Sequence, residues 1–319
     1  MKAVGLLRHG GPEVLQVLDV PTPHAGPGEV RIRVRVAAVN PADTLIRAGL
    51  TPIRQRGAHP VIPGLDVAGT IDEIGPGTDT GLAVGDEVMA MVNPTRPGGG
   101  GYAERVVLSE SWVAPVPTGA SLAEAATLPL NGLTALHALD QLDLPEGSTI
   151  AVTGAAGAVG GYALQLAKAA GHRVLADAAP ADVPLVAALG ADDVVPRGPG
   201  VADRFRELTS QGVDAVVDAA IIGVPLLAAI RRDGALAYVR EVPDSTAFAQ
   251  AAAARGIRLV HAFVHEYDGR RDKLDLLCRL AGEGRLGLRV ADTFLPQRAA
   301  EAHRLLEAGG VRGRLVLEF

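Results

Sequence analysis

The stretch from Thr149 to Ala170, TIAVTGAAGAVGGYALQLAKAA, constrains the fold of this chain most. It opens with an apolar run at 149–152 that is typical of a parallel strand buried on both faces. A turn of glycine and alanine follows, and apolar residues then return at helical spacing. Strand, turn and helix in this order predict a binding site for a dinucleotide pyrophosphate. Small residues let the backbone approach the phosphates, and the first helical N–H groups face their negative charge.

The turn carries alanine where the common fingerprint has its first glycine. By itself the motif is weak, because similar residues also serve close packing of a helix on a strand. The alternating strands and helices that follow it favour the nucleotide site. We therefore expect cofactor contacts from Ala155, Ala156, Gly157, Ala158, Val159 and Gly160.

Composition excludes several classes of function. The 319 residues, 48% of them apolar, are enough for two domains, and a net charge of −6 without a basic stripe argues against a nucleic-acid partner. The single cysteine, Cys278, excludes an intramolecular disulfide and a cysteine-rich zinc cluster. No apolar run approaches the ~20 residues of a membrane span, and no signal peptide is evident. We expect a cytoplasmic protein with no membrane partner.

The pattern changes near Ser121, which forms a capping-box signature with Glu124. Before it, strict alternation predicts a half-buried strand at 30–36, and shorter strand candidates separated by glycine and proline predict a partly open barrel. After it strands and helices alternate, which predicts a parallel sheet with helices on both faces. Strands are expected at 149–152, 173–176, 194–195, 214–218, 235–239 and 258–260, and helices at 184–189, 201–209, 224–231, 271–281 and 297–307.

Short motifs run in order along nearly the whole chain: GPEVL (11–15), AVNPAD (38–43), IPGLDVAG (62–69), VGDEV (84–88), GYAE (101–104), LPLNGLTA (128–135) and AHRLLE (302–307). Together they resemble the medium-chain dehydrogenase/reductase superfamily, in its zinc-independent quinone oxidoreductase branch. The resemblance implies an α/β protein with two domains and an active site in the cleft between them. A GroES-like partly open β-barrel would comprise 1–121 and 266–319, and a Rossmann doubly wound parallel sheet 122–265.

The resemblance also bears on metal binding. Zinc-dependent members hold their metal with a cysteine, a His-Glu pair and a second cysteine, and those places here hold Asn40, Leu65–Asp66 and a position near Asn131. We expect no metal. Oxidising an alcohol needs a Lewis acid to stabilise the alkoxide. Hydride addition to a quinone or an α,β-unsaturated carbonyl needs only one or two hydrogen-bond donors, so a reductase of such substrates is the favoured function.

Three residues are candidates for catalysis. Asn40 is expected near the nicotinamide and substrate, although it also suits a turn before a proline. Asp43 is expected to support Asn40 or a backbone amide, or to cap a helix. Tyr267 carries a phenol that suits protonation of the enolate after hydride transfer, and water serves equally well. His137 and His303, inside apolar helices, are interpreted as structural.

Further cofactor contacts are expected outside the glycine turn. Asn131 and Thr134 lie in the segment that resembles the family's phosphate contact, with Thr134 beginning a helix; plain helix packing is the alternative. Ala219, Ala220 and Tyr238 follow later strands and are also expected to line the cofactor site.

Two residues point to different cofactors. Asp177 lies about 20 residues past Gly157, the spacing at which an acid binds the ribose 2′-hydroxyl of NAD. Arg197 stands where relatives place an aromatic residue beside the 2′-phosphate of NADP, which a guanidinium binds well. We expect NADPH, with NADH the alternative.

Two other functions remain open. A dedicated enoyl or ketone reductase of a biosynthetic pathway would show a narrow substrate profile, and a nucleotide-binding protein with little turnover would bind cofactor without oxidising it. The strand at 258–260 is expected to pair with its copy in a homodimer, as in relatives.

Overall fold

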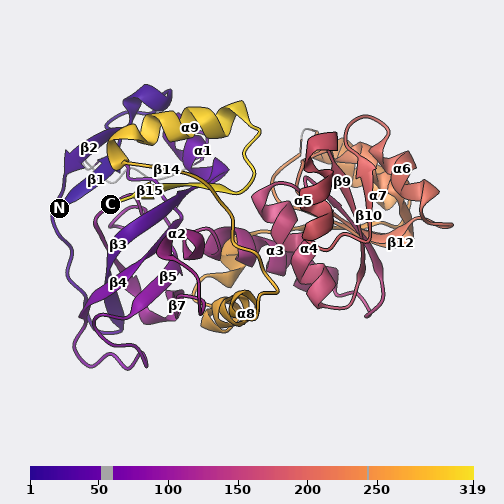
Figure 1. Ribbon diagram of the computed structural model, residues 1–319. Helices are drawn as coiled ribbons and strands as arrows, with labels where there is room; N and C mark the ends of the chain where they lie inside the picture. Colours follow the sequence, from indigo (N-terminus) through magenta and orange to yellow (C-terminus); the bar gives the residue numbers. More distant parts are fainter. Residues whose placement is uncertain (52–59, 243) are drawn as a thin grey trace. The chain divides into compact units, whose positions relative to one another are not determined.

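The computed structural model describes residues 1–51, 60–242 and 244–319. The chain forms two compact units. Unit 1 comprises Met1–Leu130, Asp268–Glu283 and Leu288–Phe319, and unit 2 comprises Asn131–Tyr267 and Gly284–Gly287. The domain limits are expected at 121 and 266. In the structure the two units divide after Leu130 and after Tyr267. Both ends of the chain lie in unit 1 (Figure 1). No helix in the described ranges is both long and apolar enough to cross a membrane.

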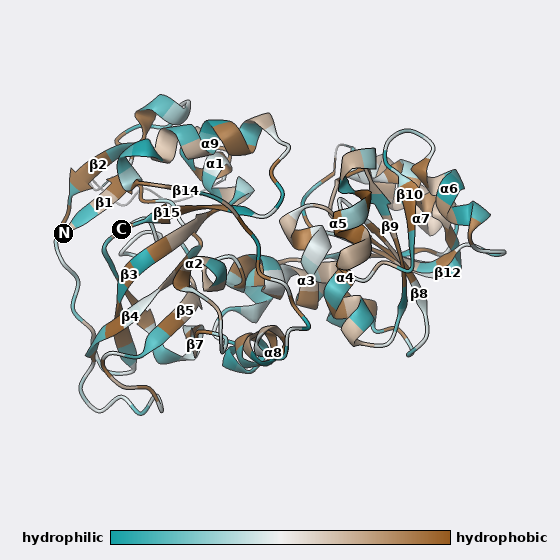
Figure 2. Cartoon of the chain, viewed as in Figure 1, coloured by the Kyte–Doolittle hydropathy of each residue, from teal (hydrophilic) through white to brown (hydrophobic). Residues whose placement is uncertain are grey.

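Unit 1 is built around the long strand β3 (Glu29–Val39). Its alternating sequence buries Val30, Ile32 and Val34 in the core and turns Arg33 and Arg35 to solvent, an alternation visible in Figure 2 as teal and brown segments. Across the sheet the strands are β14 (Val290–Phe294), β15 (Arg314–Glu318), β3, β4 (Asp66–Ile74), β5 (Glu87–Met91) and β7 (Val113–Pro115), and β6 (Arg105–Ser109) also pairs with β3. A separate antiparallel pair is β1 (Lys2–Gly5) and β2 (Gln16–Asp19).

Short helices surround this sheet. They are η1 (Pro12–Val14), α1 (Pro41–Ala48), η2 (Glu110–Trp112), α2 (Leu122–Ala125), α8 (Arg271–Gly282), η6 (Pro296–Arg298) and α9 (Ala299–Ala308). The capping box expected before α2 is confirmed, because Ser121 Oγ accepts from the Glu124 N–H and a Glu124 carboxylate oxygen accepts from the Ser121 N–H. Helix α9 packs on β15, β3 and α1, and α8 packs on β7.

Unit 2 contains a parallel sheet whose order confirms the doubly wound prediction. Its strands in sequence are β8 (Thr149–Thr153), β9 (Arg173–Ala178), β10 (Asp193–Pro196), β11 (Val213–Asp218), β12 (Ile230–Tyr238) and β13 (Arg258–His261). They are arranged β10-β9-β8-β11-β12-β13, which is the Rossmann order. The helices are α3 (Pro129–Leu142, all but its first two residues), α4 (Ala158–Ala169), η3 (Pro180–Asp182), α5 (Val183–Ala188), α6 (Val201–Glu207), η4 (Val224–Ala229), α7 (Ser245–Ala253) and η5 (Val264–Tyr267).

The helix expected at 224–231 is wrong. The chain forms the 3-10 helix η4 there, and strand β12 already begins at Ile230 rather than at 235. Pro225 lies in the first turn of η4, and Leu226 and Leu227 are buried under the sheet. The apolar residues of this segment have a spacing that resembles that of an α-helix. However, the buried Ile230 directly after η4 is already the first residue of β12. Helix α7, capped by the Asp244 side chain, was not expected from the sequence.

Candidate active site

Six residues lie level with one another at the carboxyl end of the sheet in unit 2. Strand register pairs Asp218 with Thr153 and with Tyr238, Tyr238 with His261, and Asp177 with Val195. The adjacent pair Val152 and Ala176 places Thr153 beside Asp177. Ligands of open parallel sheets bind at this edge. The register therefore places two of the predicted cofactor residues, Asp177 and Tyr238, along the edge where a dinucleotide is expected.

The glycine turn lies at this edge, between β8 and α4. Gly154 has φ +66°, a conformation that favours glycine. A Cβ at Gly160 would lie 2.3 Å from the Gly154 carbonyl oxygen, so this glycine lets the helix pack against the turn. Gly157 is the N-cap of α4, and as a glycine it has no side chain with which to cap the helix. The first amides of α4 are therefore suited to a pyrophosphate, and the residues fit the expected cofactor.

Ala219 and Ala220 lie against the turn. A Cβ at Gly154 would approach the Ala219 carbonyl carbon and the Ala220 nitrogen, each at 3.3 Å. The Ala220 N–H also donates to Thr153 Oγ1 at 3.3 Å, and that hydroxyl donates to Asp218 Oδ1 at 2.8 Å. Thr153 and Asp218 were missed as site residues. The signal for them was an acid and a hydroxyl, each directly at the end of an apolar strand.

Asp177 lies on β9, and its side chain is hydrogen-bonded to the backbone of the glycine turn. Its Oδ1 accepts a hydrogen bond from the Gly154 N–H at 2.7 Å, and the Ala155 N–H is also a donor to it. The residue is only 5% exposed. Desolvation raises the pKa of Asp177, while these amides and the charge of Arg197 lower it. The carboxylate thus fastens β9 to the glycine turn.

Arg197 follows β10 and is exposed. Its N–H donates to the Ala178 carbonyl at 2.9 Å, which fixes the backbone next to the end of β9. The guanidinium is close enough to Asp177 to act on its pKa. An exposed cation at this edge is suited to an anionic group on the adenosine ribose.

Asn131 and Thr134 are both buried on α3. The expectation that Thr134 begins the helix is wrong, because α3 already starts at Pro129. Proline is favoured in the first turn of a helix, where its missing N–H has no partner to lose. Thr134 therefore lies within the helix, and its role as a phosphate contact stays a prediction.

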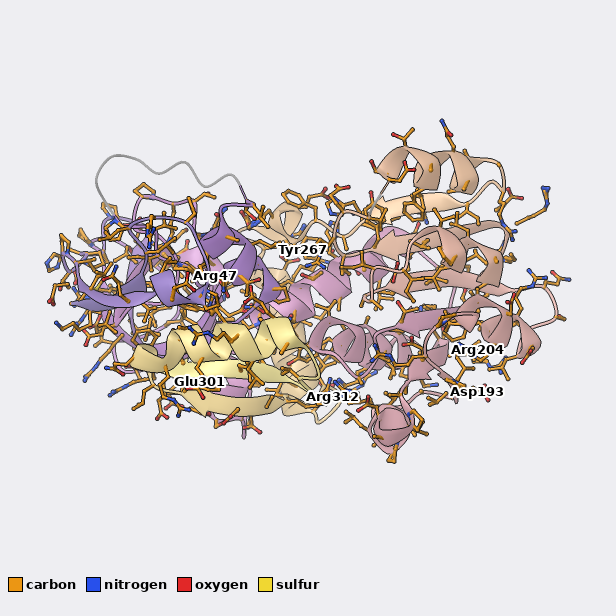
Figure 3. All side chains as sticks on the ribbon, turned by 90° about the horizontal axis from the view of Figure 1, so that it is seen from above. Arg47, Asp193, Arg204, Tyr267, Glu301 and Arg312 are labelled. Carbon is orange, nitrogen blue, oxygen red and sulfur yellow. The ribbon has the colours of Figure 1, made fainter. Side chains whose placement is uncertain are left out.

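Tyr267, labelled in Figure 3, is buried against α3 within unit 2. Its hydroxyl donates to Asp140, and its ring meets His137 edge-on with centroids 4.8 Å apart. His137 Nε2 lies 3.1 Å from Glu266, so this histidine has a structural environment, as expected. Since the phenol proton is directed to Asp140, donation to a substrate would require that hydrogen bond to break.

Asn40 lies in unit 1, where it directly follows β3 and is the N-cap of α1. Its Nδ2 donates to Asp66 Oδ2 at 2.7 Å, and Asp66 Oδ1 accepts from the Leu130 N–H at 2.6 Å. All of this lies in a buried environment. The Asn40 amide is therefore held in a fixed orientation by Asp66, which stands at the place of a zinc ligand in zinc-dependent relatives.

Asp43 supports Asn40, as expected. Its Oδ2 accepts from the Asn40 N–H at 2.8 Å and from the Tyr102 hydroxyl at 3.2 Å, and its Oδ1 accepts from the Gly64 N–H at 2.7 Å. Desolvation raises the pKa of Asp43 and of Asp66 to about 7, although their hydrogen bonds lower it. Tyr102 was missed, and its only signal was its place in the GYAE motif.

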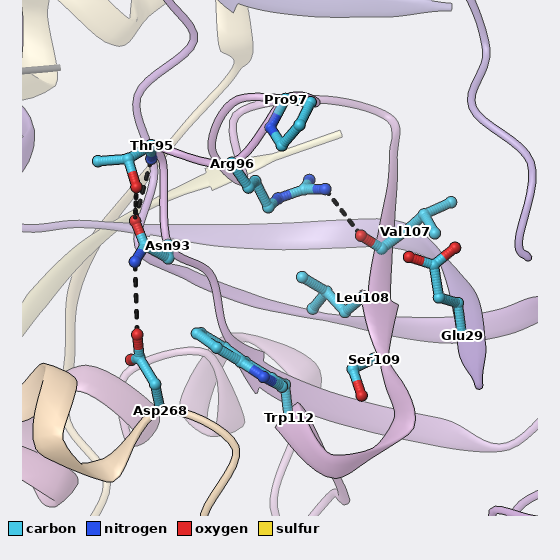
Figure 4. Close-up of a pocket in the computed structure, with 10 residues that line it drawn as sticks. All are labelled: Glu29, Asn93, Thr95, Arg96, Pro97, Val107, Leu108, Ser109, Trp112 and Asp268. Atoms are coloured by element: carbon cyan, nitrogen blue, oxygen red, sulfur yellow. Dashed lines mark hydrogen bonds between the residues drawn. The ribbon is translucent and has the colours of Figure 1, made fainter. Parts of the chain in front are cut away.

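Unit 1 also contains a pocket of about 310 Å³, shown in Figure 4. Arg96 crosses one side and donates to the Val107 carbonyl at 2.7 Å, and the Trp112 ring forms another side. Glu29 and Asp268 add negative charge to the same lining. The predicted catalytic residues do not line this pocket.

Comparison with known proteins identifies the family. The family model for the alcohol dehydrogenase GroES-like domain matches residues 26–118, and that for zinc-binding dehydrogenase matches 189–317. The solved structure of an NAD-dependent alcohol dehydrogenase is 33% identical, covers 100% of both chains and superposes with a TM-score of 0.88. The chain belongs to the medium-chain dehydrogenase/reductase superfamily. The expected pairing of a GroES-like domain with a Rossmann domain is thereby confirmed.

Two further members of the superfamily are informative. A chloroplast envelope quinone oxidoreductase homolog from Arabidopsis thaliana is 36% identical over 222 residues, or 68% of this chain. The match spans 66% of that protein, just under two thirds of its length. The mycobacterial protein Rv1454c, solved in complex with NADPH, is 30% identical over 100% of both chains, with a TM-score of 0.87.

Proposed function

We propose that this chain is an NAD(P)H-dependent oxidoreductase that transfers hydride to a quinone or an α,β-unsaturated carbonyl compound. The observation that carries the proposal is the buried Asn40, held through its backbone by Asp43 and through its side chain by Asp66. The relatives named quinone oxidoreductases support the same class of substrate. When bound, the reduced nicotinamide supplies the hydride.

The Asn40 amide is suited to polarise a carbonyl group. The bond to Asp66 fixes the plane of the Asn40 amide. In the reacting complex this amide donates to the substrate oxygen, which gains negative charge as hydride arrives. A donor that is already oriented needs no reorganisation at that moment. We assign the proton to water, because the Tyr267 hydroxyl is engaged with Asp140.

We infer that the reaction does not use zinc. In zinc-dependent relatives the metal is held by thiolates and imidazole, and the corresponding residues here are Asn40 and Leu65–Asp66. Leucine offers no ligand atom, and the asparagine nitrogen is committed as a donor to Asp66. The only cysteine, Cys278, lies on α8, where its Sγ donates to the carbonyl of Pro115 on β7 rather than contacting Asn40.

We further infer a preference for NADPH. Asp177, the residue that would bind the ribose 2′-hydroxyl of NAD, already accepts hydrogen bonds from the glycine turn. Arg197 is exposed at the neighbouring strand end, where it suits a 2′-phosphate. The NADPH complex of Rv1454c supports this assignment, whereas the relative described as NAD-dependent supports the alternative.

The test of function is the oxidation of NADPH and NADH, measured separately with a panel of quinones and α,β-unsaturated ketones. We expect turnover, and we expect Asn40→Ala to lower kcat/KM for the acceptor by about 10²-fold, the usual effect of losing one such donor. Gln16→Ala removes an exposed amide of unit 1 and serves as the control. Cofactor binding without turnover of any acceptor would contradict the proposal and favour a dedicated substrate or a non-catalytic role.

Cofactor choice is tested with Arg197→Ala. Loss of a charge-assisted contact to the 2′-phosphate should weaken NADPH binding by about 10-fold or more and leave NADH binding unchanged. Fluorescence titration of each cofactor measures this directly. Arg232→Ala, another exposed arginine of unit 2, lies near the start of β12, away from the strand ends, and is the matched control. Equal weakening of both cofactors would remove Arg197 from the selection of NADPH.

A further inference from the structure

A buried chain of polar side chains in unit 1 runs from the Asn40 region to the surface. Beyond Asp43, the Tyr102 hydroxyl lies 3.3 Å from His303 Nε2. His303 Nδ1 lies 3.4 Å from an Arg47 guanidinium nitrogen, and Arg47 forms a two-fold ion pair with Glu307. Figure 3 shows Arg47 beside helix α9, which carries His303 and Glu307. The chain links α1, the GYAE motif and α9.

Hydrogen bonds along this chain have only one possible direction. A guanidinium is always a donor, so His303 Nδ1 accepts from Arg47. His303 is then neutral with its proton on Nε2, and that N–H donates to the Tyr102 oxygen. The Tyr102 proton in turn is directed to Asp43 Oδ2. Desolvation and the charge of Arg47 lower the pKa of His303 to about 3, in agreement with a neutral ring.

The consequence falls on Asp43. Its two oxygens accept three hydrogen bonds, from the Asn40 N–H, the Gly64 N–H and the Tyr102 hydroxyl. A carboxylate is able to accept all three. In a protonated carboxyl group one oxygen carries a hydrogen, so the group accepts fewer hydrogen bonds. Two other charged groups also act on this region: Arg314 on β15 favours the carboxylate, and Asp66 on β4 opposes it.

We propose that Tyr102 and His303 are positioning residues for hydride transfer. Their hydrogen bonds, oriented by Arg47, favour the carboxylate form of Asp43, and that carboxylate holds the start of α1 and the Asn40 backbone in the reactive position. The proposal rests on the proposed function, because it takes Asn40 as the residue that contacts the substrate. It gives a chemical role to the GYAE and AHRLLE motifs.

The decisive variant is Tyr102→Phe, which keeps the ring and removes the hydroxyl. Without this donor Asp43 holds its proton to higher pH, so the acid limb of kcat/KM for the acceptor should move up by about one pH unit. The dissociation constant of the cofactor, measured by fluorescence, should not change. Thr44→Val is the matched control, because it removes a buried hydroxyl on α1 that donates to the Pro41 carbonyl and is not part of the chain from Asp43 to Glu307.

His303 provides an independent pair of variants. His303→Gln retains an acceptor for Arg47 and a donor for Tyr102, and should keep the wild-type pH profile. His303→Leu retains neither and should reproduce the shift of Tyr102→Phe. If all of these variants keep the wild-type acid limb, the proposal is overturned. If His303→Leu or Tyr102→Phe does not fold, the glutamine variant still decides, because a shifted profile there contradicts the proposed direction of donation.

A second readout separates this proposal from the proposed function. In protein without cofactor, the free energy of unfolding in urea falls with rising pH as long as Asp43 remains protonated in the folded state. Tyr102→Phe should extend that fall to higher pH by about the same one unit. If the pH dependence of the unfolding free energy is the same in Tyr102→Phe as in the wild type, the role of Tyr102 is overturned. If Asn40→Ala leaves turnover intact while the unfolding curve shifts, the proposed function fails in its site and the control of Asp43 by Tyr102 stands.

Discussion

Asp43 and Asp66 place two carboxyl groups in one buried region, and this determines how the stability of unit 1 depends on pH. Desolvation raises both pKa values to about 7, whereas in the unfolded chain an aspartate titrates near 4. At these two groups the folded protein therefore binds more protons than the unfolded chain between those values. Their contribution to stability should be highest at the acid end of this range, fall as pH rises to about 7 and then level off, while His303, whose pKa is lowered to about 3, acts in the opposite direction.

Asp66→Asn tests this prediction, because it removes one of the two titrating groups and keeps an acceptor for the Leu130 N–H. Relative to wild type, the variant should gain roughly 1 kcal/mol of unfolding free energy per pH unit between about pH 5 and pH 7. Urea unfolding across that range measures the difference. Asp79→Asn, at an exposed aspartate of the same unit, should show no such trend. A difference that is constant with pH would contradict the buried-carboxylate account.

At the residue scale, the sequence indicated which side chains matter better than what they contact. Asn40 and Asp43 were expected to act together, and their spacing at the start of a helix explains why. The Asp177 carboxylate, expected to bind a ribose, also accepts from the Gly154 N–H, and its contact with a ribose stays a prediction. Tyr102 and Asp66 reach Asn40 and Asp43 from distant segments, and no local pattern encodes such contacts.

At the scale of elements, the packing of α4 on the glycine turn is sensitive to a single methyl group. A Cβ at Gly160 would lie 2.3 Å from the Gly154 oxygen and 2.7 Å from its carbonyl carbon, both backbone atoms. Gly160→Ala should push the helix away from β8, lower the unfolding free energy by about 1–3 kcal/mol and weaken cofactor binding. Thermal unfolding and fluorescence titration measure the two effects.

Gly282→Ala is the control for this substitution. This glycine ends α8, and a Cβ there would meet its nearest neighbour, the Thr118 nitrogen, at an ordinary 3.5 Å. Alanine has the higher helix propensity, so no loss of stability is expected. Similar behaviour of the two variants would show that α4 can move away from the turn without consequence, and the close-packing argument would be wrong.

Segments with strict alternation or a motif beside them were easier to predict than others. The alternation that predicts a strand at 30–36 corresponds to β3, and the apolar run at 149–152, followed by the glycine turn, corresponds to β8. Helix α1 and strand β14 were missed, because their eight and five residues show neither a clear period nor such a motif. Strand β14 depends on its parallel pairing with β15 rather than on its own sequence.

At the scale of the whole molecule, we predict a homodimer formed through β13. This strand is an edge of the sheet in unit 2, and an unpaired edge is suited to pairing with a second copy. Light scattering at micromolar concentration should give twice the mass of the chain. Amide hydrogen exchange of β13 should slow as protein concentration rises, while β10, the opposite edge strand, serves as the internal control. A monomer, or equal behaviour of both edges, would contradict the prediction.

Pairing of β15 with β3 has a consequence for the order of events during synthesis. Leu315 pairs with Val39, directly before Asn40, so the strand that presents Asn40 lacks one neighbour until residues 314–318 are available. All of unit 2 is translated before them. On the ribosome, all strands of the parallel sheet in unit 2 are therefore available first, while β3, which precedes Asn40, still lacks its hydrogen-bonding partner β15. Nascent chains stalled before residue 314 should therefore bind cofactor yet expose β3 to chaperones and proteases.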